Sequence, residues 1–153
     1  MNAKVPAPGW FTAVAIIALL WNLFGVAAYL MTVMGPALLS PEMLAAMPET
    51  ERAEVEKGLA QLAATPAWAT AAFALATFGG LLGSILLLVR KNLAVPVFGV
   101  SLVALLVQQV YGFFLSEAPV GGGAALILPL AVLAFAVFLL WLAMKAKREG
   151  WSN

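Results

Sequence analysis

Four long apolar segments constrain the fold of this chain more than any other feature. They cover approximately residues 10–34, 67–89, 93–115 and 124–144. A helix needs about 20 apolar residues to cross the hydrocarbon core of a bilayer, and each segment reaches that length. Apolar side chains make up 64% of the sequence and charged side chains only 10%, whereas a soluble domain is about a quarter charged. The sequence therefore predicts an all-α integral membrane protein, an up-down bundle of four transmembrane helices with residues 1–153 as a single transmembrane domain.

The first apolar segment could also be compared with a secretory signal peptide. It follows a positive residue, and the small side chains at 26–28 would suit a cleavage site. Its apolar core is longer than the roughly 7–15 residues of a secretory signal. We therefore expect it to be a membrane-spanning helix that is retained.

The one sizeable polar segment, residues 35–66, joins the first two apolar segments. Ser40 followed by Pro41 and Glu42 is typical of a helix N-terminus, with a capping hydroxyl, a proline at the first helical position and an acid in the first turn. Residues 49–64 place apolar side chains on one side and charged side chains on the other, which predicts an amphipathic helix. Two interpretations are open: a surface helix over the bundle mouth or the lipid headgroups, and a lid or partner-docking element.

The basic residues predict the orientation of the chain, because cytoplasmic loops of membrane proteins carry an excess of lysine and arginine. Six basic residues would lie on the side of the N-terminus and two on the opposite side, together with six glutamates. We therefore expect cytoplasmic N- and C-termini and an extracytoplasmic amphipathic helix between the first and second spans. The six are Lys4, Arg90, Lys91, Lys145, Lys147 and Arg148, and the two are Arg52 and Lys57.

Small residues on the second segment predict the main packing seam. Lipid tails are as apolar as leucine, so membrane helices associate through close backbone packing and interhelical hydrogen bonds. Small side chains recur here every four residues, which lets helix backbones approach closely. The seam lies either within one chain or between subunits. Its residues are Ala72, Ala76, Gly79, Gly80, Gly83 and Ser84.

Polar side chains inside the spans are few, and their spacing groups them on helix faces. An amide that faces lipid is unfavourable, so an amide such as Gln108 needs a partner or water. At about 1.5 Å of rise per residue, Asn22, Thr77 and Gln108 come to the middle or outer part of the bundle. The predicted cluster consists of Asn22, Tyr29, Thr77, Gln108 and Tyr111.

Two interpretations of this cluster are open. In the structural one, neutral groups hydrogen-bond across helices, each pair contributing about 0.6–2 kcal/mol. In the functional one, the first three spans enclose a polar pocket, open toward the outside, for a small neutral ligand. Asn22 and Gln108 would then supply donors and acceptors, and Trp21, Tyr29 and Tyr111 would form walls.

Composition argues against several function classes. The chain has no histidine and no cysteine, and no span contains a charged residue. Intramembrane hydrolysis needs paired acids, a metal, or a serine with a base, so we expect no enzyme, no metal and no cofactor. Ser84 and Ser101 are interpreted as helix-packing residues. A net charge of +1 gives no reason to expect a nucleic-acid partner.

Several motifs resemble those of small, uncharacterised bacterial inner-membrane proteins with four predicted helices. The motifs are Trp21–Gly25 with Ala28 and Tyr29, Ser40–Glu42, Pro66–Trp68, Phe78–Gly80 with Gly83, Arg90 with Lys91, and Gln109 with Tyr111. Some of those proteins carry an automatic sugar-transporter label. The resemblance implies a location in a bacterial inner membrane and a transporter-like or ligand-binding role, and it assigns no site residues.

Two functions remain open at this stage. The first is an accessory role in the lipid bilayer, through a homo-oligomer or a membrane-protein partner. The alternative is a small transporter or ligand-binding protein with a neutral polar pocket. An accessory role predicts exposed small-residue grooves and no continuous cavity. Transport would instead require an oligomer with polar faces turned to a shared axis.

Overall fold

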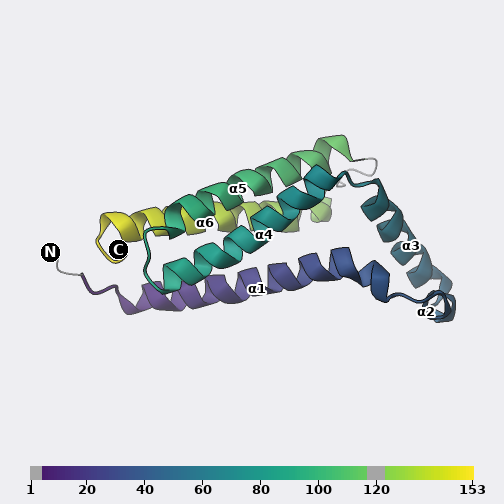
Figure 1. The fold of residues 1–153 in the computed structure, drawn as a ribbon, viewed down its shortest axis with the longest axis horizontal. Coiled ribbons are helices and arrows are strands. Elements are labelled where there is room, and N and C mark those ends of the chain that lie inside the picture. The colour runs from purple at the N-terminus through teal and green to yellow at the C-terminus, as the bar shows by residue number, and fades with distance from the viewer. Residues whose placement is uncertain (1–4, 117–122) are drawn as a thin grey trace.

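The computed structural model describes residues 5–116 and 123–153, and its regular elements are helices throughout these ranges. Four helical stretches are long and apolar enough to cross a membrane, which confirms the predicted fold class. They pack side by side with alternating direction (Figure 1). They are α1 (Gly9–Leu38), α4 (Ala67–Leu88), α5 (Ala94–Val110) with the π-helical turn η1 (Tyr111–Leu115), and the 3-10 turn η2 (Gly123–Leu126) with α6 (Ile127–Arg148). Lys4, one of the predicted cytoplasmic cations, lies outside the described residues.

Helix α1 is longer than the sequence predicted, because it continues to Leu38 instead of ending near Met34. Pro36 removes one backbone hydrogen bond only near the end of the helix, where carbonyl groups lack partners in any case. The Leu39 N–H then donates to the Pro36 carbonyl at 3.3 Å. With 30 residues the helix is about 45 Å long, which exceeds a hydrocarbon core of about 30 Å.

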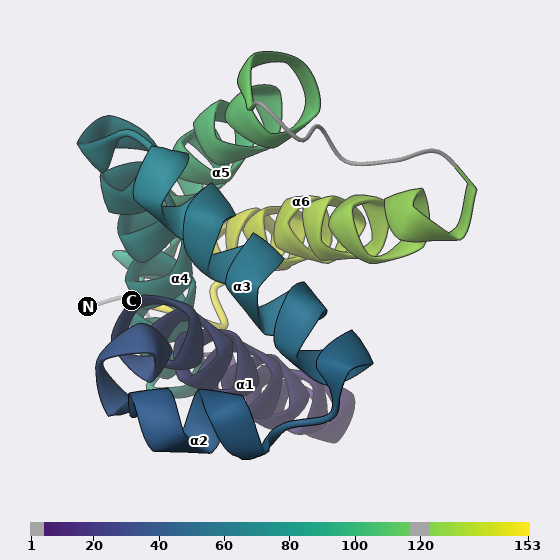
Figure 2. The ribbon, with the colours of Figure 1, turned by 90° about the vertical axis from the view of Figure 1, so that its right-hand side faces the viewer.

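Two short helices, α2 (Pro41–Ala46) and α3 (Glu49–Ala64), follow at the far end of α1. The predicted cap is confirmed, since the Met43 N–H donates to Ser40 Oγ at 3.2 Å. The predicted helix at 49–64 is confirmed as α3, which lies beyond the end of the bundle and crosses it obliquely (Figures 1 and 2). None of its residues is fully buried.

The four long helices do not contact one another equally. Helix α4 packs most extensively against α5 and then against α1, and α6 packs mainly against α5. Seen from the α3 end, α1 and α6 lie on either side of a wider separation (Figure 2). The order around the bundle is therefore α1, α4, α5 and α6, with the looser side between α6 and α1.

The buried apolar core lies toward the end of the bundle that carries the start of α1, the α4–α5 turn and the end of α6. Phe11, Leu87 and Leu142 are each no more than 1% exposed. Large apolar side chains elsewhere on the spans are mostly exposed, as expected for helices that face lipid. The core cluster comprises Phe11, Ala15, Ala18, Leu87, Ala94, Phe98, Leu139, Leu142, Ala143 and Ala146.

The segment after α6 closes this end by pairing with the α4–α5 turn. The Asn92 N–H donates to the Asn153 carbonyl at 2.7 Å, and the Asn153 N–H donates to the Arg90 carbonyl at 2.9 Å. The Ser152 hydroxyl donates to Asn92 Oδ1 at 2.7 Å. Arg90 has a φ of 60°, a left-handed conformation that lets the backbone reverse within this tight turn.

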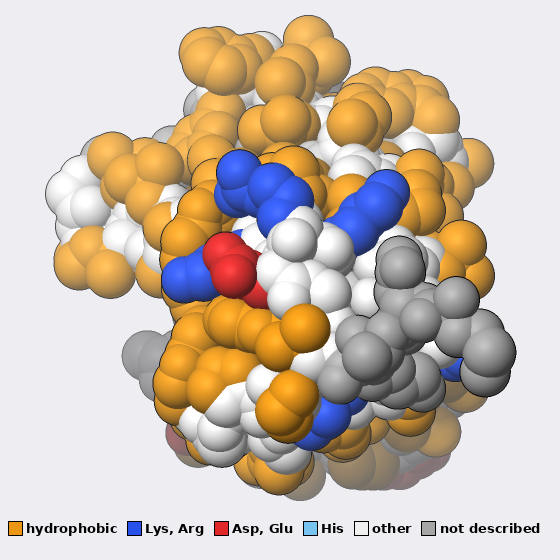
Figure 3. Space-filling view, turned by 90° about the vertical axis from the view of Figure 1, so that its left-hand side faces the viewer, with side chains coloured by type: hydrophobic (Ala, Val, Ile, Leu, Met, Phe, Trp, Pro, Cys, Tyr) orange, Lys and Arg blue, Asp and Glu red, His pale blue; other side chains and the backbone are white. Residues whose placement is uncertain are grey.

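Aromatic rings and a lysine complete the closed end. The Trp151 ring lies 5.6 Å from the rings of both Trp10 and Phe11. The Lys145 ammonium lies 5.3–5.8 Å from the indoles of Trp10, Trp141 and Trp151, within cation–π range. A view of this end shows lysine and arginine side chains gathered among apolar ones (Figure 3).

Candidate functional site

Helix α4 approaches both of its neighbours closely through glycine. A Cβ atom added at Gly83 would lie 2.7 Å from the ring of Phe98 in α5. A Cβ atom added at Gly80 would collide with the side-chain oxygen of Asn22 in α1. Five members of the predicted seam thus lie on contacts inside the chain: Ala76, Gly79, Gly80, Gly83 and Ser84.

Asn22 joins α1 to α4 by hydrogen bonds. Its amide nitrogen donates to the Ala18 carbonyl at 2.8 Å and to Ser84 Oγ at 3.0 Å. Ser84 is fully buried and donates its own hydrogen to the Gly80 carbonyl at 2.9 Å. The Ser84 oxygen must therefore accept from Asn22, which fixes the orientation of the Asn22 amide.

Two further hydroxyl groups lie on α4 and α5. Ser101 of α5 donates to the Ala76 carbonyl of α4 at 2.6 Å, so it links the two helices. Thr77 of α4 donates to the Phe73 carbonyl of its own helix at 2.6 Å. Both hydroxyls use their hydrogen in a bond to the backbone, so only their oxygen lone pairs remain for another partner.

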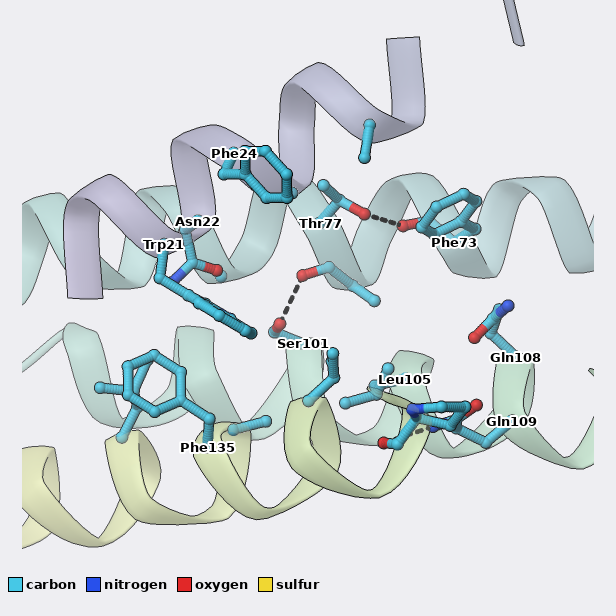
Figure 4. A pocket seen from close by; sticks show the side chains of 18 of the residues that line it. Trp21, Asn22, Phe24, Phe73, Thr77, Ser101, Leu105, Gln108, Gln109 and Phe135 are labelled. Atoms are coloured by element: carbon cyan, nitrogen blue, oxygen red, sulfur yellow. Dashed lines mark hydrogen bonds between the residues drawn. The ribbon is translucent and has the colours of Figure 1, made fainter. Parts of the chain in front are cut away.

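A cavity of about 350 Å³ lies between α1, α4, α5 and α6, at the lower end of the roughly 300–1,000 Å³ typical of small-molecule sites. Figure 4 shows Asn22, Thr77, Ser101 and Gln108 around this space, on three different helices. Aromatic and aliphatic side chains form the rest of the wall. These include Trp21, Phe24, Phe73, Phe98, Leu105, Leu128, Pro129, Val132, Phe135 and Leu139.

The structure divides the predicted polar cluster. Asn22, Thr77 and Gln108 line the same cavity. Tyr29 instead packs against the rings of Phe73 and Phe78, at 5.1 and 5.6 Å between centroids. Tyr111 lies 5.4 Å from the ring of Trp68. The two tyrosines are not among the residues that line the cavity, so the prediction that they would form its walls is not met.

Sequence reasoning underestimated Gln109, Ser101 and the fourth span. Gln109 lines the cavity and donates to the Pro129 carbonyl of α6 at 3.0 Å. Helix α6 supplies a whole wall, although the pocket was predicted between the first three spans only. Its interior has no polar residue, so no side chain marked it as part of a site. Trp21, which lies too deep for an interfacial aromatic, packs 5.3 Å from Phe135 and forms part of the wall.

The chemistry available in this cavity is neutral. Its lining contains amides, hydroxyls and apolar groups, and no charged side chain. Within residues 5–116 and 123–153, no group of three or more metal-ligating side chains comes together. Among the residues that line the cavity, none is a histidine, lysine or carboxylate that could act as a base for Ser101. The arrangement can therefore recognise a neutral molecule by hydrogen bonds and apolar contact.

A second hollow is a shallow groove on the outer face of α4 and α5. Its floor is made of small residues such as Ala72 and Gly99. Ala72 is the remaining member of the predicted seam, and a Cβ atom added at Gly99 would meet nothing within 4 Å. Trp68, Leu75, Pro96 and Val103 form its sides. The groove is apolar and faces outward, where lipid or another helix would lie.

Comparison with family models, with curated proteins and with solved structures finds no match to this chain. Function is therefore inferred from the geometry of the cavity and of the groove.

Proposed function

We propose that this chain is a small multi-pass protein of a bacterial inner membrane that binds a small neutral ligand in the cavity between α1, α4, α5 and α6. The convergence of Asn22, Ser101 and Gln108 on one largely apolar space carries the proposal. Apolar walls with a few placed polar groups are the usual composition of a ligand site. The basic residues at the closed end support an orientation with both termini in the cytoplasm.

A purely structural role for the polar groups explains only part of this arrangement. Asn22 and Ser101 do bond across helices, as packing residues would. Gln108, in contrast, is half-buried beside the cavity and makes no hydrogen bond to any other residue in the described part of the chain. An amide at this depth is costly in free energy unless a molecule in the space beside it supplies a hydrogen-bonding partner.

The cavity suits a mostly apolar molecule better than a sugar. A sugar presents a hydroxyl on nearly every carbon, and each buried hydroxyl needs a partner. Most of the lining residues are apolar, so most such hydroxyls would be left unpaired. The polar amides also turn into the interior of one chain, which favours a site within each subunit over a pathway shared between subunits.

A cavity-filling substitution tests the proposal. In Gly25→Leu, the first added carbon would lie 3.8 Å from Thr77 Cγ2, an ordinary contact, and the rest of the side chain would occupy the cavity. Gly35→Leu is the matched control on the same helix, because a Cβ atom there meets nothing within 4 Å.

Native mass spectrometry of protein purified from membranes should show a retained small molecule in the wild type and in Gly35→Leu. It should be lost from Gly25→Leu. Equal retention by all three proteins would contradict binding in this cavity.

An accessory role is the second candidate, and the α4–α5 groove favours it. Small residues let a helix approach closely, as Gly99 and Ala72 would allow. The occupant tested is a second copy of this chain. Gly99→Leu should then convert a dimer to a monomer in mild detergent, measured by light scattering, whereas Gly35→Leu should not. A monomeric wild type would contradict this role.

A further inference from the structure

The hydrogen bonds around the cavity are distributed unequally between donors and acceptors. Each donor hydrogen of Asn22, Thr77 and Ser101 that can be assigned is already bonded to protein. A side chain that has used its hydrogens can offer a ligand only oxygen lone pairs. The cavity therefore presents mainly acceptors.

Its two partners fix the orientation of the Asn22 amide. Ser84 gives its hydrogen to the Gly80 carbonyl, so its oxygen can only accept. Carbonyl groups can only accept as well, and Ala18 provides one. The Asn22 NH₂ group must face both, and its Oδ1 is directed to the other side, against Gly80.

Gln109 follows the same pattern. Its amide nitrogen donates to the Pro129 carbonyl, which can only accept. The Gln109 Oε1 atom is therefore left to accept a hydrogen bond from another molecule. No donor among the described residues reaches the side-chain oxygen of Asn22 or Gln109. Gln108 is the one cavity amide in this part of the chain whose NH₂ group has no protein partner.

The cavity also has a side that opens toward lipid. Phe24 of α1 is 74% exposed and Leu128 of α6 is 65% exposed, although both line the cavity. On the side formed by α4 and α5, Ala76 and Gly80 of α4 and Ser101 of α5 are buried. The polar groups thus lie at the back of a space whose mouth is apolar and faces the bilayer.

We propose that the cavity takes a membrane-dissolved, neutral amphiphile whose head group donates a hydrogen bond, an alcohol being the simplest case. The head would reach the acceptor oxygens of Asn22 and Ser101, and the apolar part would leave between Phe24 and Leu128. This inference rests on the proposed ligand-binding function and specifies its ligand class and its route of entry.

Three probes with the same numbers of carbon and oxygen atoms separate the possibilities: 1-decanol, which donates and accepts, and methyl nonyl ether and 2-decanone, which only accept. Their affinities are measured by calorimetry on the protein in phosphatidylcholine nanodiscs, with partitioning into empty nanodiscs subtracted. We expect 1-decanol to bind about tenfold more tightly than either acceptor-only probe, the effect of roughly one satisfied hydrogen bond. Gly25→Leu should abolish this binding and Gly35→Leu should preserve it.

A pair of serine variants locates the head group. Ser101→Ala removes one acceptor at the cavity and should reduce the preference for the alcohol. Ser116→Ala removes a hydroxyl that bonds Gly112 outside the cavity and should leave the preference unchanged.

The other outcomes are also decisive. Equal affinities, or a preference for the ketone, that are abolished by Gly25→Leu would overturn the donor inference and leave the proposed function standing. An alcohol preference that survives Gly25→Leu would place the donor site elsewhere and overturn the inference. Failure of all three probes to distinguish the wild type from Gly25→Leu would overturn the proposed function itself.

Discussion

The two halves of the bundle are built from the same four helices and are held together in different ways. In the closed half, which carries the start of α1, the α4–α5 turn and the segment after α6, helices meet through a buried apolar cluster, an edge-to-face contact of two indoles and a backbone pairing of Asn153 with Arg90 and Asn92. In the opposite, open half, few side chains are fully buried, and amides and hydroxyls border a cavity. The chain therefore separates a region that fixes the fold from a region with room for another molecule.

This difference teaches where a small membrane protein can place a site. Apolar burial gives little drive between helices in lipid, so an empty or exchangeable space needs rigidity from somewhere else. Here the closed half supplies it, because α1, α4, α5 and α6 are all anchored there. The far half can then hold a cavity without losing the helix arrangement. Four comparisons, from the largest expected effect to the smallest, test this division.

Leucine truncation on α6 should give the largest contrast. Leu142 is completely buried in the closed half, and Leu128 is mostly exposed at the cavity mouth. Leu142→Ala should lower the free energy of unfolding by about 2–5 kcal/mol, because it leaves an unfilled space. Leu128→Ala should change it by less than about 0.5 kcal/mol. Steric-trapping measurements of unfolding check both, and equal effects would contradict the division into two halves.

Glycine substitution tests the close approach of α4 and α5. Gly83→Ala would drive a methyl group into the ring of Phe98, which is only 2% exposed and has little freedom to move. We expect a loss of about 1–3 kcal/mol in the free energy of unfolding. Gly99→Ala is the matched control on α5, since the added methyl meets nothing. A neutral Gly83→Ala would mean that the seam is looser than the structure shows.

The adjacent glutamines separate bonding from binding in the open half. Gln109→Leu removes the hydrogen bond to Pro129 and should cost about 0.6–1.7 kcal/mol, with faster amide hydrogen exchange in the first turns of α6. Gln108→Leu breaks no bond to the described residues and should leave stability nearly unchanged. Its expected effect is weaker retention of the bound small molecule in native mass spectrometry, because the Gln108 NH₂ group is the cavity amide donor without a partner among the described residues. If Gln108→Leu unfolded the protein, its amide would be structural and the binding interpretation would lose its support.

The smallest effect concerns the N-terminus of α2, which lies beyond the open half. The Ser40 hydroxyl, by hydrogen-bonding the Glu42 carboxylate, holds the pKa of Glu42 below its ordinary value of 4.5. A lowered folded-state pKa means that the ionised form is favoured on folding, so this contribution is present above pH 4.5 and is lost as the pH falls through the folded-state pKa. In Ser40→Ala the pKa of Glu42 should rise toward the ordinary value. Carbon NMR of the Glu42 carboxyl checks it, and an unchanged pKa of Glu42 in Ser40→Ala would contradict the prediction.

Much of the fold could be predicted because apolar length and capping chemistry are local properties. The long helices, the helix at 49–64 and the Ser40 cap all follow from short stretches of sequence. The backbone pairing of Asn153 with Arg90 and Asn92 could not be predicted, since it uses backbone groups that any residue carries. The additional residue per turn at Tyr111–Leu115 is likewise invisible in a periodicity argument.

The candidate site was predicted less completely than the fold, for a geometric reason. Face and depth arguments locate polar groups such as Asn22, Thr77 and Gln108, which do line the cavity. They fail where a long side chain reaches around its helix, as Gln109 does to bond Pro129. They also fail for α6, because an apolar wall carries no signal that distinguishes it from a surface in contact with lipid.

The absence of formal charge from the spans has a consequence for energy coupling. A membrane potential acts on a protein chiefly through charges that move in its field, at about 2.3 kcal/mol per elementary charge per 100 mV. Residues 10–38, 67–88, 94–115 and 123–144 contain no ionised side chain that could sense that field. A neutral guest adds none. Occupancy of the cavity should then depend on the concentration of the guest and not on voltage. Applying a transmembrane potential should leave that occupancy unchanged.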